Sequence, residues 1–400
     1  MKKTKVVQIN SSCGHGSTGK IAVAISRLLN EHGVENYIFY SGNHKSDYPQ
    51  GIMTACKLDI RLHQIQSRFL GDQGFHSSLA TLRMVRKIEQ IQPDAIVLHN
   101  LHGYYLNLDI LFRFLKRYQK PVYWTLHDCW AFTGHCTHYM LADCDRWKHG
   151  CGACSQKNKY PYTWFLDRSA SLYRRKKGLF AALDDLTIIT PSQWLADQVA
   201  ESFLSNCPVQ VIHNGIDLKV FSPRKSNFRQ RYGLEGKRIL LGVASVWSEY
   251  KGLDVFLSLF QRLDREKYQL ILVGTDSEVE RQIPNGVITI PRTQNQAELA
   301  ELYTAADIFI NPTREDNYPT VNMEAIACGT PVITFHTGGC AEIVDDSCGA
   351  VVWDNTLETL IKEISNVEQN LSWYRTNCRA RASEFEQSNC FNQYVQLICG

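Results

Sequence analysis

Short apolar runs alternate with longer amphipathic segments along the chain, and the alternation predicts strands that are followed by helices. The strands expected in the first half lie at residues 6–9, 36–40, 95–99 and 122–127, and within 186–194 and 209–217. The helices expected there lie at residues 21–29, 109–118 and 170–182, and residues 41–92 read as polar and helical. Strands and helices that alternate in this way are typical of a parallel, doubly wound sheet.

A polar segment at residues 222–238 interrupts this rhythm, and the alternation then restarts. The expected strands of the second half lie at residues 239–245, 268–273, 287–290 and 308–310, and the helices at 253–263, 296–305 and 321–328, with a helical tail at 357–400. A chain of 400 residues exceeds the usual size of a single core. The sequence therefore predicts two α/β domains, residues 1–215 and 216–378, and a final helix at 379–400.

Residues 311–334 combine features that suit a sugar nucleotide. A strand ends at Pro312, an Asn-Tyr-Pro turn follows, and a helix begins near Val321. Backbone N–H groups at a helix N-terminus suit a phosphate, and Asp316 and Glu324 can accept hydrogen bonds from hydroxyls. The alternatives are a turn residue and a capping acid, or a glycosidase pair. Helical spacing places the two acids roughly 12 Å apart, too far for that pair.

The acid, seven residues, Glu and then AIACGTPVI resemble the signature of retaining glycosyltransferase family 4, and DNYP is similar to its capsule and colanic-acid branch. The resemblance implies the GT-B fold, in which two Rossmann-like doubly wound parallel-sheet domains face a cleft. It implies that the nucleotide ribose binds Glu324 and the donor-sugar hydroxyls bind Asp316. The backbone amides expected at the distal phosphate are those of Asn317, Tyr318, Thr320 and Val321. Glu315 remains an alternative to Asp316.

Lys251 resembles the lysine with which the family contacts the donor diphosphate. Family members usually carry an arginine five residues earlier, where this chain has Val246. Arg314, just before the acidic loop, is the candidate replacement. Lys251, Asp316 and His127 are the expected catalytic residues, and the resemblance implies no cofactor for catalysis.

The first half offers further site residues at strand ends. The His127-Asp128 pair resembles the family's donor-sugar histidine, with Asp128 expected to orient His127, although a buried packing role is the alternative. His99, His102 and Asp128 are expected on the acceptor side, at the carboxyl edge of the sheet. The glycine-rich loop containing Gly16 and Gly19 is expected near the donor phosphate. It fits the core of a nucleotide-kinase loop, but Ile21 replaces the required hydroxyl residue.

The net charge of +3 gives no case for nucleic acid, and no apolar run is long enough to span a membrane. The 14 cysteines without an export signal predict a protein of the reducing cytoplasm. The basic run at residues 174–177 indicates either a solvated helix face or reversible contact with the inner face of the cell membrane.

Four of the 14 cysteines crowd into the expected loop at residues 129–155. Cys136, Cys144, Cys151 and Cys154 predict a structural zinc site, with unligated thiols or a redox pair as alternatives. The function expected is transfer of a sugar from a UDP- or GDP-sugar to a glycan, lipid-linked acceptor in bacterial surface polysaccharide biosynthesis. The alternatives are a sugar-nucleotide epimerase of the same fold and a non-catalytic zinc-dependent interaction module.

Overall fold

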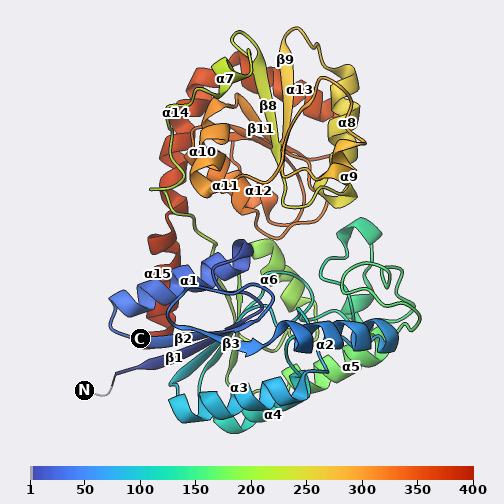
Figure 1. Ribbon diagram of the computed structural model, residues 1–400, viewed down its shortest axis with the longest axis vertical. Helices are drawn as coiled ribbons and strands as arrows, with labels where there is room; N and C mark the ends of the chain where they lie inside the picture. The colour runs from blue at the N-terminus through green and yellow to red at the C-terminus, as the bar shows by residue number, and fades with distance from the viewer. Residues whose placement is uncertain (1–2) are drawn as a thin grey trace. The chain divides into compact units, whose positions relative to one another are not determined.

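The computed structural model describes residues 3–400, which form two compact units (Figure 1). One unit comprises the chain up to His213 together with Phe391–Gly400, and the other comprises Asn214–Cys390. Each unit is a parallel sheet with its own hydrophobic core. The predicted α/β class is therefore confirmed.

The first unit contains a seven-stranded sheet in the order β3-β2-β1-β4-β5-β6-β7, with every pair parallel. Its strands are β1 (Lys5–Asn10), β2 (Glu35–Ser41), β3 (Gly51–Ala55), β4 (Ala95–Leu98), β5 (Val122–Thr125), β6 (Leu186–Thr190) and β7 (Val209–Val211). Its helices are α1 (Gly16–Glu31), α2 (Lys57–Leu70), α3 (Ser78–Ile91), α4 (Leu108–Tyr118), α5 (Ser169–Phe180) and α6 (Gln193–Ala200), with short 3-10 turns η1 (Met140–Ala142) and η2 (Arg146–Lys148).

The apolar patterns explain why these segments adopt their structures. All four residues of β4 and of β5 are buried, as expected for central strands of a parallel sheet. In α4 the buried residues recur at Leu108, Leu111 and Leu115, which is the spacing of a helix face that covers a sheet. The sequence prediction missed β3, because this edge strand is half-exposed and lacks a continuous apolar run.

The second unit contains a six-stranded parallel sheet in the order β10-β9-β8-β11-β12-β13. Its strands are β8 (Arg238–Val243), β9 (Tyr268–Val273), β10 (Ile288–Ile290), β11 (Ile308–Asn311), β12 (Val332–Phe335) and β13 (Gly349–Val352). Its helices are α7 (Phe228–Arg231), α8 (Leu253–Arg262), α9 (Ser277–Glu280), α10 (Gln296–Ala305), α11 (Thr320–Ala327), α12 (Cys340–Ile343), α13 (Leu357–Gln369) and α14 (Leu371–Ala382), with 3-10 turns η3 (Glu249–Lys251) and η4 (Ser383–Phe385).

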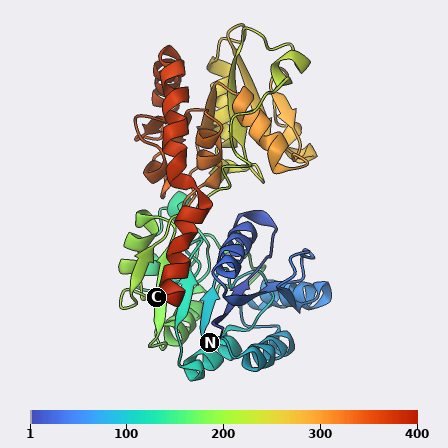
Figure 2. The same cartoon turned by 90° about the vertical axis from the view of Figure 1, so that its left-hand side faces the viewer.

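The C-terminal helix α15 (Gln387–Cys399) begins in the second unit, and its residues from Phe391 onward belong to the first. The Tyr394 hydroxyl lies 3.0 Å from the Thr125 hydroxyl of β5, and the Tyr123 hydroxyl donates to the Leu397 carbonyl at 2.9 Å. The end of α15 therefore packs beside β5 (Figure 2).

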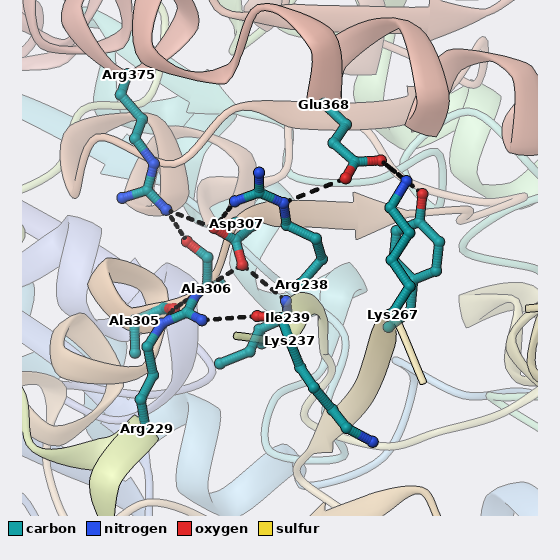
Figure 3. Close-up of polar contacts among 11 residues, drawn as sticks. Arg229, Lys237, Arg238, Ile239, Lys267, Ala305, Ala306, Asp307, Glu368 and Arg375 are labelled. Atoms are coloured by element: carbon teal, nitrogen blue, oxygen red, sulfur yellow. Dashed lines mark hydrogen bonds and ion pairs between the residues drawn. The ribbon is translucent and has the colours of Figure 1, made fainter. Parts of the chain in front are cut away.

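A charged cluster joins the amino ends of β8 and β11 to the helices of the second unit (Figure 3). The buried Asp307 carboxylate accepts hydrogen bonds from Arg229 at 2.5 Å, from the Ile239 amide at 2.8 Å and from Arg375 at 3.3 Å. Beside it, Glu368 pairs with Arg238. These contacts lie at the edge of the sheet opposite the carboxyl ends of its strands, where ligands bind in such sheets. We therefore assign the cluster to folding.

No helix among residues 3–400 combines the length and the apolar character that crossing a bilayer requires.

Candidate active site

The loop between β11 and α11 presents the predicted donor-binding residues at the carboxyl edge of the second sheet. Nearly all residues from Asn311 to Thr334 are buried. The partly exposed residues in this stretch are Arg314, Asp316, Thr320, Val321 and Glu324. Every one of these positions is among those that the sequence predicts to bind the donor, so the stretch exposes these side chains while the rest of it packs into the core.

Lys251 and Asp316 form an ion pair at this edge, with Lys251 Nζ 2.6 Å from Asp316 Oδ2. Gly252 follows Lys251 with φ +73°, and a Cβ atom there would lie 2.4 Å from the Pro312 carbonyl oxygen. Only glycine therefore lets the turn that carries Lys251 approach the loop after β11 so closely. The Thr313 hydroxyl and the Arg314 amide both donate to the Tyr250 carbonyl, which fixes the two segments together.

Electrostatics keep the Lys251 ammonium charged. Burial lowers the pKa of Lys251, but the Asp316 carboxylate outweighs burial and raises that pKa above its usual value. Asp316 is itself held by the Asn317 amide, which donates to Asp316 Oδ1 at 2.9 Å. Gly338, with φ +54°, lies against the Asp316 carbonyl, where a Cβ atom would be 1.8 Å away. The site thus holds a fixed cation and a fixed anion side by side.

The remaining residues predicted to bind the donor lie on α11 or just before it. Glu324 lies on α11, eight residues after Asp316, and accepts a hydrogen bond from the Tyr303 hydroxyl at 3.2 Å. The helix α11 begins after Pro319, whose side chain cannot accept a hydrogen bond and so does not cap the amides of Thr320 and Val321 in the first turn. Tyr318 is buried beside them, and the Asn317 carbonyl accepts from the Gly339 amide.

The structure gives Glu315 and Asp316 different surroundings. Glu315 is buried, whereas Asp316 is partly exposed and pairs with Lys251. This difference favours Asp316 as the acid that faces a ligand.

Arg314 is engaged by neighbouring groups. Its guanidinium forms two hydrogen bonds with the Asp254 carboxylate, at 2.7 and 2.6 Å, and one with the Glu249 carbonyl at 2.6 Å. Val246, which stands where the family usually has arginine, is exposed. To contact a phosphate, Arg314 would have to exchange Asp254 for it, so its role as the replacement cation stays a prediction.

In the first unit, a chain of hydrogen bonds links Gln8, His99 and His127 across three neighbouring strands. His99 Nε2 lies 3.0 Å from Gln8 Oε1, and His99 Nδ1 lies 3.1 Å from His127 Nε2. The Gln8 amide nitrogen already donates to the Ala22 carbonyl, so Gln8 Oε1 must accept from His99.

This chain determines which nitrogen of His127 carries the proton. Burial lowers the pKa of His127 to about 4 and that of His99 well below its usual value, so both rings are neutral at pH 7. A neutral His99 that donates from Nε2 must accept at Nδ1, and His127 Nε2 is therefore the donor between the two rings. His127 Nδ1 is left as an acceptor. His127, which is partly exposed, can then receive a hydrogen bond from a ligand hydroxyl.

Asp128 does not orient His127 as the sequence suggested. Its carboxylate lies 2.7 Å from His102 Nε2 and accepts from the Trp130 amide at 2.9 Å. Burial raises the pKa of Asp128, but His102 outweighs burial and that pKa falls to about 2. His102 Nδ1 in turn lies 3.0 Å from the Tyr160 hydroxyl. The partner of His127 is instead His99, which is buried behind it, and His102 is the more accessible of the two predicted acceptor-side histidines.

The glycine-rich loop leads directly into α1. Gly16 is exposed with φ +65° at the start of the helix, and Gly19 is buried in its first turn. The Gly14 amide donates to the Gly19 carbonyl at 3.0 Å. The loop follows β1 and therefore lies at the same edge of the sheet as His99 and His127.

The basic run at residues 174–177 is not a uniformly solvated face. Lys176 is fully buried, donates to the Trp130 carbonyl at 2.8 Å and to the Thr133 carbonyl at 3.2 Å, and lies over the Trp130 ring. Arg175 pairs with Asp109. Lys176 and Arg175 therefore bind groups within the protein. Only Arg174 and Lys177 remain for the membrane contact predicted for this run.

The four clustered cysteines do not support the zinc prediction. Within residues 3–400 no group of three or more His, Cys, Asp or Glu side chains is placed to hold a metal ion. Cys136 is buried, Cys151 Sγ accepts from the Gly134 amide, and burial raises the pKa of Cys151 to about 11.

Several residues of these sites were missed by the sequence prediction. Gln8 is a polar residue within an otherwise apolar strand, and a polar residue at such a position could have been predicted from the sequence to bind another polar group. The spacing of the buried residues Leu172, Lys176 and Phe180 on α5 is another, because it places Lys176 on the face that packs inward. Tyr160 and Tyr303 could not be predicted in this way, because Tyr160 contacts His102 and Tyr303 contacts Glu324, which lie far from them in the sequence.

Two protein-family models and a protein of known sequence match this chain. Residues 18–220 match the family model described as Glycosyltransferase Family 4, and residues 237–370 match the one described as Glycosyl transferases group 1. A protein of Escherichia coli (strain K12) described as the colanic acid biosynthesis glycosyl transferase WcaC is 26% identical over 374 residues, which cover 89% of each chain.

Solved structures resemble the whole chain. Sucrose-phosphate synthase from Thermosynechococcus elongatus aligns with a TM-score of 0.71 at 16% identity, over 99% of this chain and 98% of its own. Anabaena HepE in complex with UDP-glucose aligns with a TM-score of 0.69 at 16% identity, over 99% of each chain. These likenesses show that the fold is GT-B, as the sequence predicted.

Proposed function

Because the chain belongs to glycosyltransferase family 4 and is therefore a transferase, we propose that it moves a sugar from a nucleoside-diphosphate sugar to a glycan with retention of configuration. The observation that carries the proposal is the Lys251–Asp316 pair beside the partly exposed edge of α11. A diphosphate needs a cation and helix-terminal amides, and a sugar needs a carboxylate acceptor. This edge offers all three within one loop.

In this proposal each donor group meets a side chain of matching chemistry. Lys251 exchanges Asp316 for the diphosphate, and the amides of Thr320 and Val321 contact the distal phosphate. Asp316, once released, accepts from hydroxyls of the donor sugar. Glu324 accepts from the ribose hydroxyls. The UDP-glucose bound by HepE supports a nucleotide-sugar donor, and the base remains UDP or GDP in the proposal.

The proposed reaction breaks the bond between the anomeric carbon and the diphosphate oxygen, and the acceptor oxygen forms the new bond on the same face. The leaving phosphate takes the acceptor's proton. Lys251 and the helix amides stabilise the negative charge that grows on the leaving group, which is the effect expected to contribute most to the rate. His127 Nδ1 accepts a hydrogen bond from a hydroxyl of the donor sugar and orients it.

The acceptor we propose is a lipid-linked glycan of a surface polysaccharide. The likeness to the colanic acid biosynthesis protein of Escherichia coli supports a polysaccharide product. A lipid-linked acceptor would bring the enzyme to a membrane surface without any spanning helix.

The test is a mass-spectrometric screen of UDP- and GDP-sugars against lipid-linked glycan acceptors, with the anomeric configuration of the product read by NMR. Gain of one sugar by the acceptor, lost in Lys251→Met, is the expected result. Conversion of the sugar nucleotide without an acceptor would indicate an epimerase and overturn the proposal. The failure of every donor to bind would overturn it as well.

A further inference from the structure

The helix α2 has its polarity reversed relative to an ordinary surface helix. Its buried residues are Ile60, His63 and Ser67, of which two are polar. Its opposite face carries large apolar side chains, and these are Leu58 (64% exposed), Leu62 (51%), Ile65 (48%) and Phe69 (48%). Their spacing of four, three and four residues forms one straight stripe along a helix. These side chains are not buried within the first unit, so we looked for another surface that the stripe would contact.

Aromatic residues of the loop after residue 160 extend this stripe at the end of α2. The Phe69 ring meets the Trp164 ring edge to face with centroids 4.6 Å apart, and the Phe165 ring lies 6.0 Å away. Trp164 and Phe165 are both exposed. The Trp164 amide donates to the Arg68 carbonyl at 2.8 Å, which fixes the loop to the helix. The apolar patch is therefore continuous and held in place by backbone contacts.

Basic residues flank the patch. Lys57, Arg61 and Arg68 recur at spacings of four and seven, which places all three along the same side of the stripe. Lys57 and Arg61 are exposed, and the Arg68 guanidinium lies 4.5 Å from the centre of the Tyr162 ring. On the neighbouring helix α3, Arg83 and Arg86 are exposed beside Leu79 and Leu82. A hydrogen bond between His63 and Ser77 joins α2 to the start of α3.

We propose that the α2 surface, defined as the stripe of Leu58, Leu62, Ile65 and Phe69 with Trp164 and Phe165, docks on an anionic lipid bilayer. An apolar helix face, an aromatic end and flanking cations are the three features with which a helix lies in the plane of a membrane interface. The cations explain why lipid fits better than a second copy of the chain, because two such surfaces would bring like charges together. The inference extends the proposed lipid-linked acceptor, on which it partly rests.

The experiment is co-sedimentation of the full chain with vesicles of phosphatidylglycerol and phosphatidylethanolamine, and with vesicles of phosphatidylcholine alone. The stripe variant is Leu62→Gln with Ile65→Gln, and its matched control is Trp373→Gln, an exposed aromatic residue of the second unit. The charge variant is Lys57→Gln with Arg61→Gln. Its control is Lys362→Gln with Arg379→Gln, two exposed cations of the second unit.

Wild-type protein is expected to sediment with anionic vesicles and to be released by salt. The stripe variant should lower the partition coefficient about tenfold or more, because both side chains lose the apolar burial that docking provides. Both controls should bind like wild type. Equal binding by the stripe variant and wild type would overturn the proposal. So would a stripe-dependent dimer without vesicle binding, seen by analytical ultracentrifugation.

Two further measurements keep the outcomes distinct. The thermal unfolding midpoint of each variant shows whether it is folded, and Phe165→Gln, a loop variant outside any helix, provides a second test of the stripe if the double variant unfolds. UDP and GDP binding is measured separately. Vesicle binding without nucleotide binding would refute the proposed UDP- or GDP-sugar donor and leave the docking surface standing, and the reverse result would refute the docking surface alone.

Discussion

The ion pair between Lys251 and Asp316 makes the sharpest prediction about the donor site. Lys251 Nζ lies 2.6 Å from Asp316 Oδ2, and the exposed fractions of the two side chains are 31% and 21%. A diphosphate that binds Lys251 must displace Asp316, so the carboxylate competes with the ligand for the same cation. Removing the cation and removing its competitor should therefore have opposite effects on nucleotide binding.

We expect Lys251→Met to weaken UDP or GDP binding by about 1.5 to 3 kcal/mol, or roughly tenfold to 150-fold, because a charge-assisted contact is lost and Asp316 is left unpaired. Asp316→Asn should bind the free nucleotide at least as tightly as wild type, because the competing charge is gone. Sugar transfer by Asp316→Asn should nevertheless fall, since the acceptor for the donor-sugar hydroxyls is weakened. The double variant should recover part of the affinity lost in Lys251→Met.

Isothermal titration calorimetry with UDP and with GDP measures all four forms of this cycle. Glu358→Gln is the matched control, because it changes an acid to an amide in an ion pair, with Arg262, that has no part in the proposed donor site. If Asp316→Asn weakened nucleotide binding as much as Lys251→Met does, the competition would be refuted and Asp316 would have to contact the nucleotide itself.

Three further predictions concern other parts of the structure. Glu324→Gln should weaken nucleotide binding about tenfold and leave inorganic pyrophosphate binding unchanged, because pyrophosphate has no ribose; equal losses for both ligands in calorimetry would contradict the ribose assignment. Gln8→Leu should lower kcat with little change in nucleotide affinity, because His99 is then free to adopt the other tautomer; an unchanged kcat would leave the chain of hydrogen bonds a packing role. Asp307→Asn should destabilise the fold by about 3 kcal/mol in guanidinium unfolding, because a buried charge network loses its anion, and native-like stability would contradict this assignment.

The sequence predicted an element correctly where neighbouring residues alone determine its structure. Buried strands such as β4 and β5 are continuous apolar runs, and the break before α11 is set by Pro312, Tyr318 and Pro319. The sites were harder, because strand order decides which side chains meet. His127 and Asp128 are neighbours in the sequence, yet each finds its partner on the loop after β4, where His99 and His102 follow that strand.

The predictions that proved wrong rested on composition rather than on position. The basic run at residues 174–177 reads as a solvated face or a membrane contact, and Arg174, Arg175 and Lys177 are exposed, but helical geometry turns Lys176 into the core. There its Nζ atom donates hydrogen bonds to the Trp130 and Thr133 carbonyls. The four cysteines at residues 136–154 are close in the sequence, but among residues 3–400 no group of side chains is placed to bind a metal ion. Likewise, α2 read as an unremarkable polar segment, because its exposed stripe is defined only once His63 and Ser67 are known to be its inward face.

The loop between Asp128 and α5 connects the acceptor-side residues to the α2 surface within one unit. Lys176 fixes its beginning, Tyr160 contacts His102, and Trp164 packs on Phe69. Four residues of extended chain span at most about 14 Å, so Tyr160 and Trp164 lie within that distance of each other. If α2 rests on a bilayer, the His102–Asp128 pair therefore lies close to the lipid surface, and an acceptor anchored in lipid can reach it while its lipid stays in the membrane. It follows that variants of the α2 surface should slow transfer to a lipid-linked acceptor in vesicles much more than transfer to the same glycan released from its lipid.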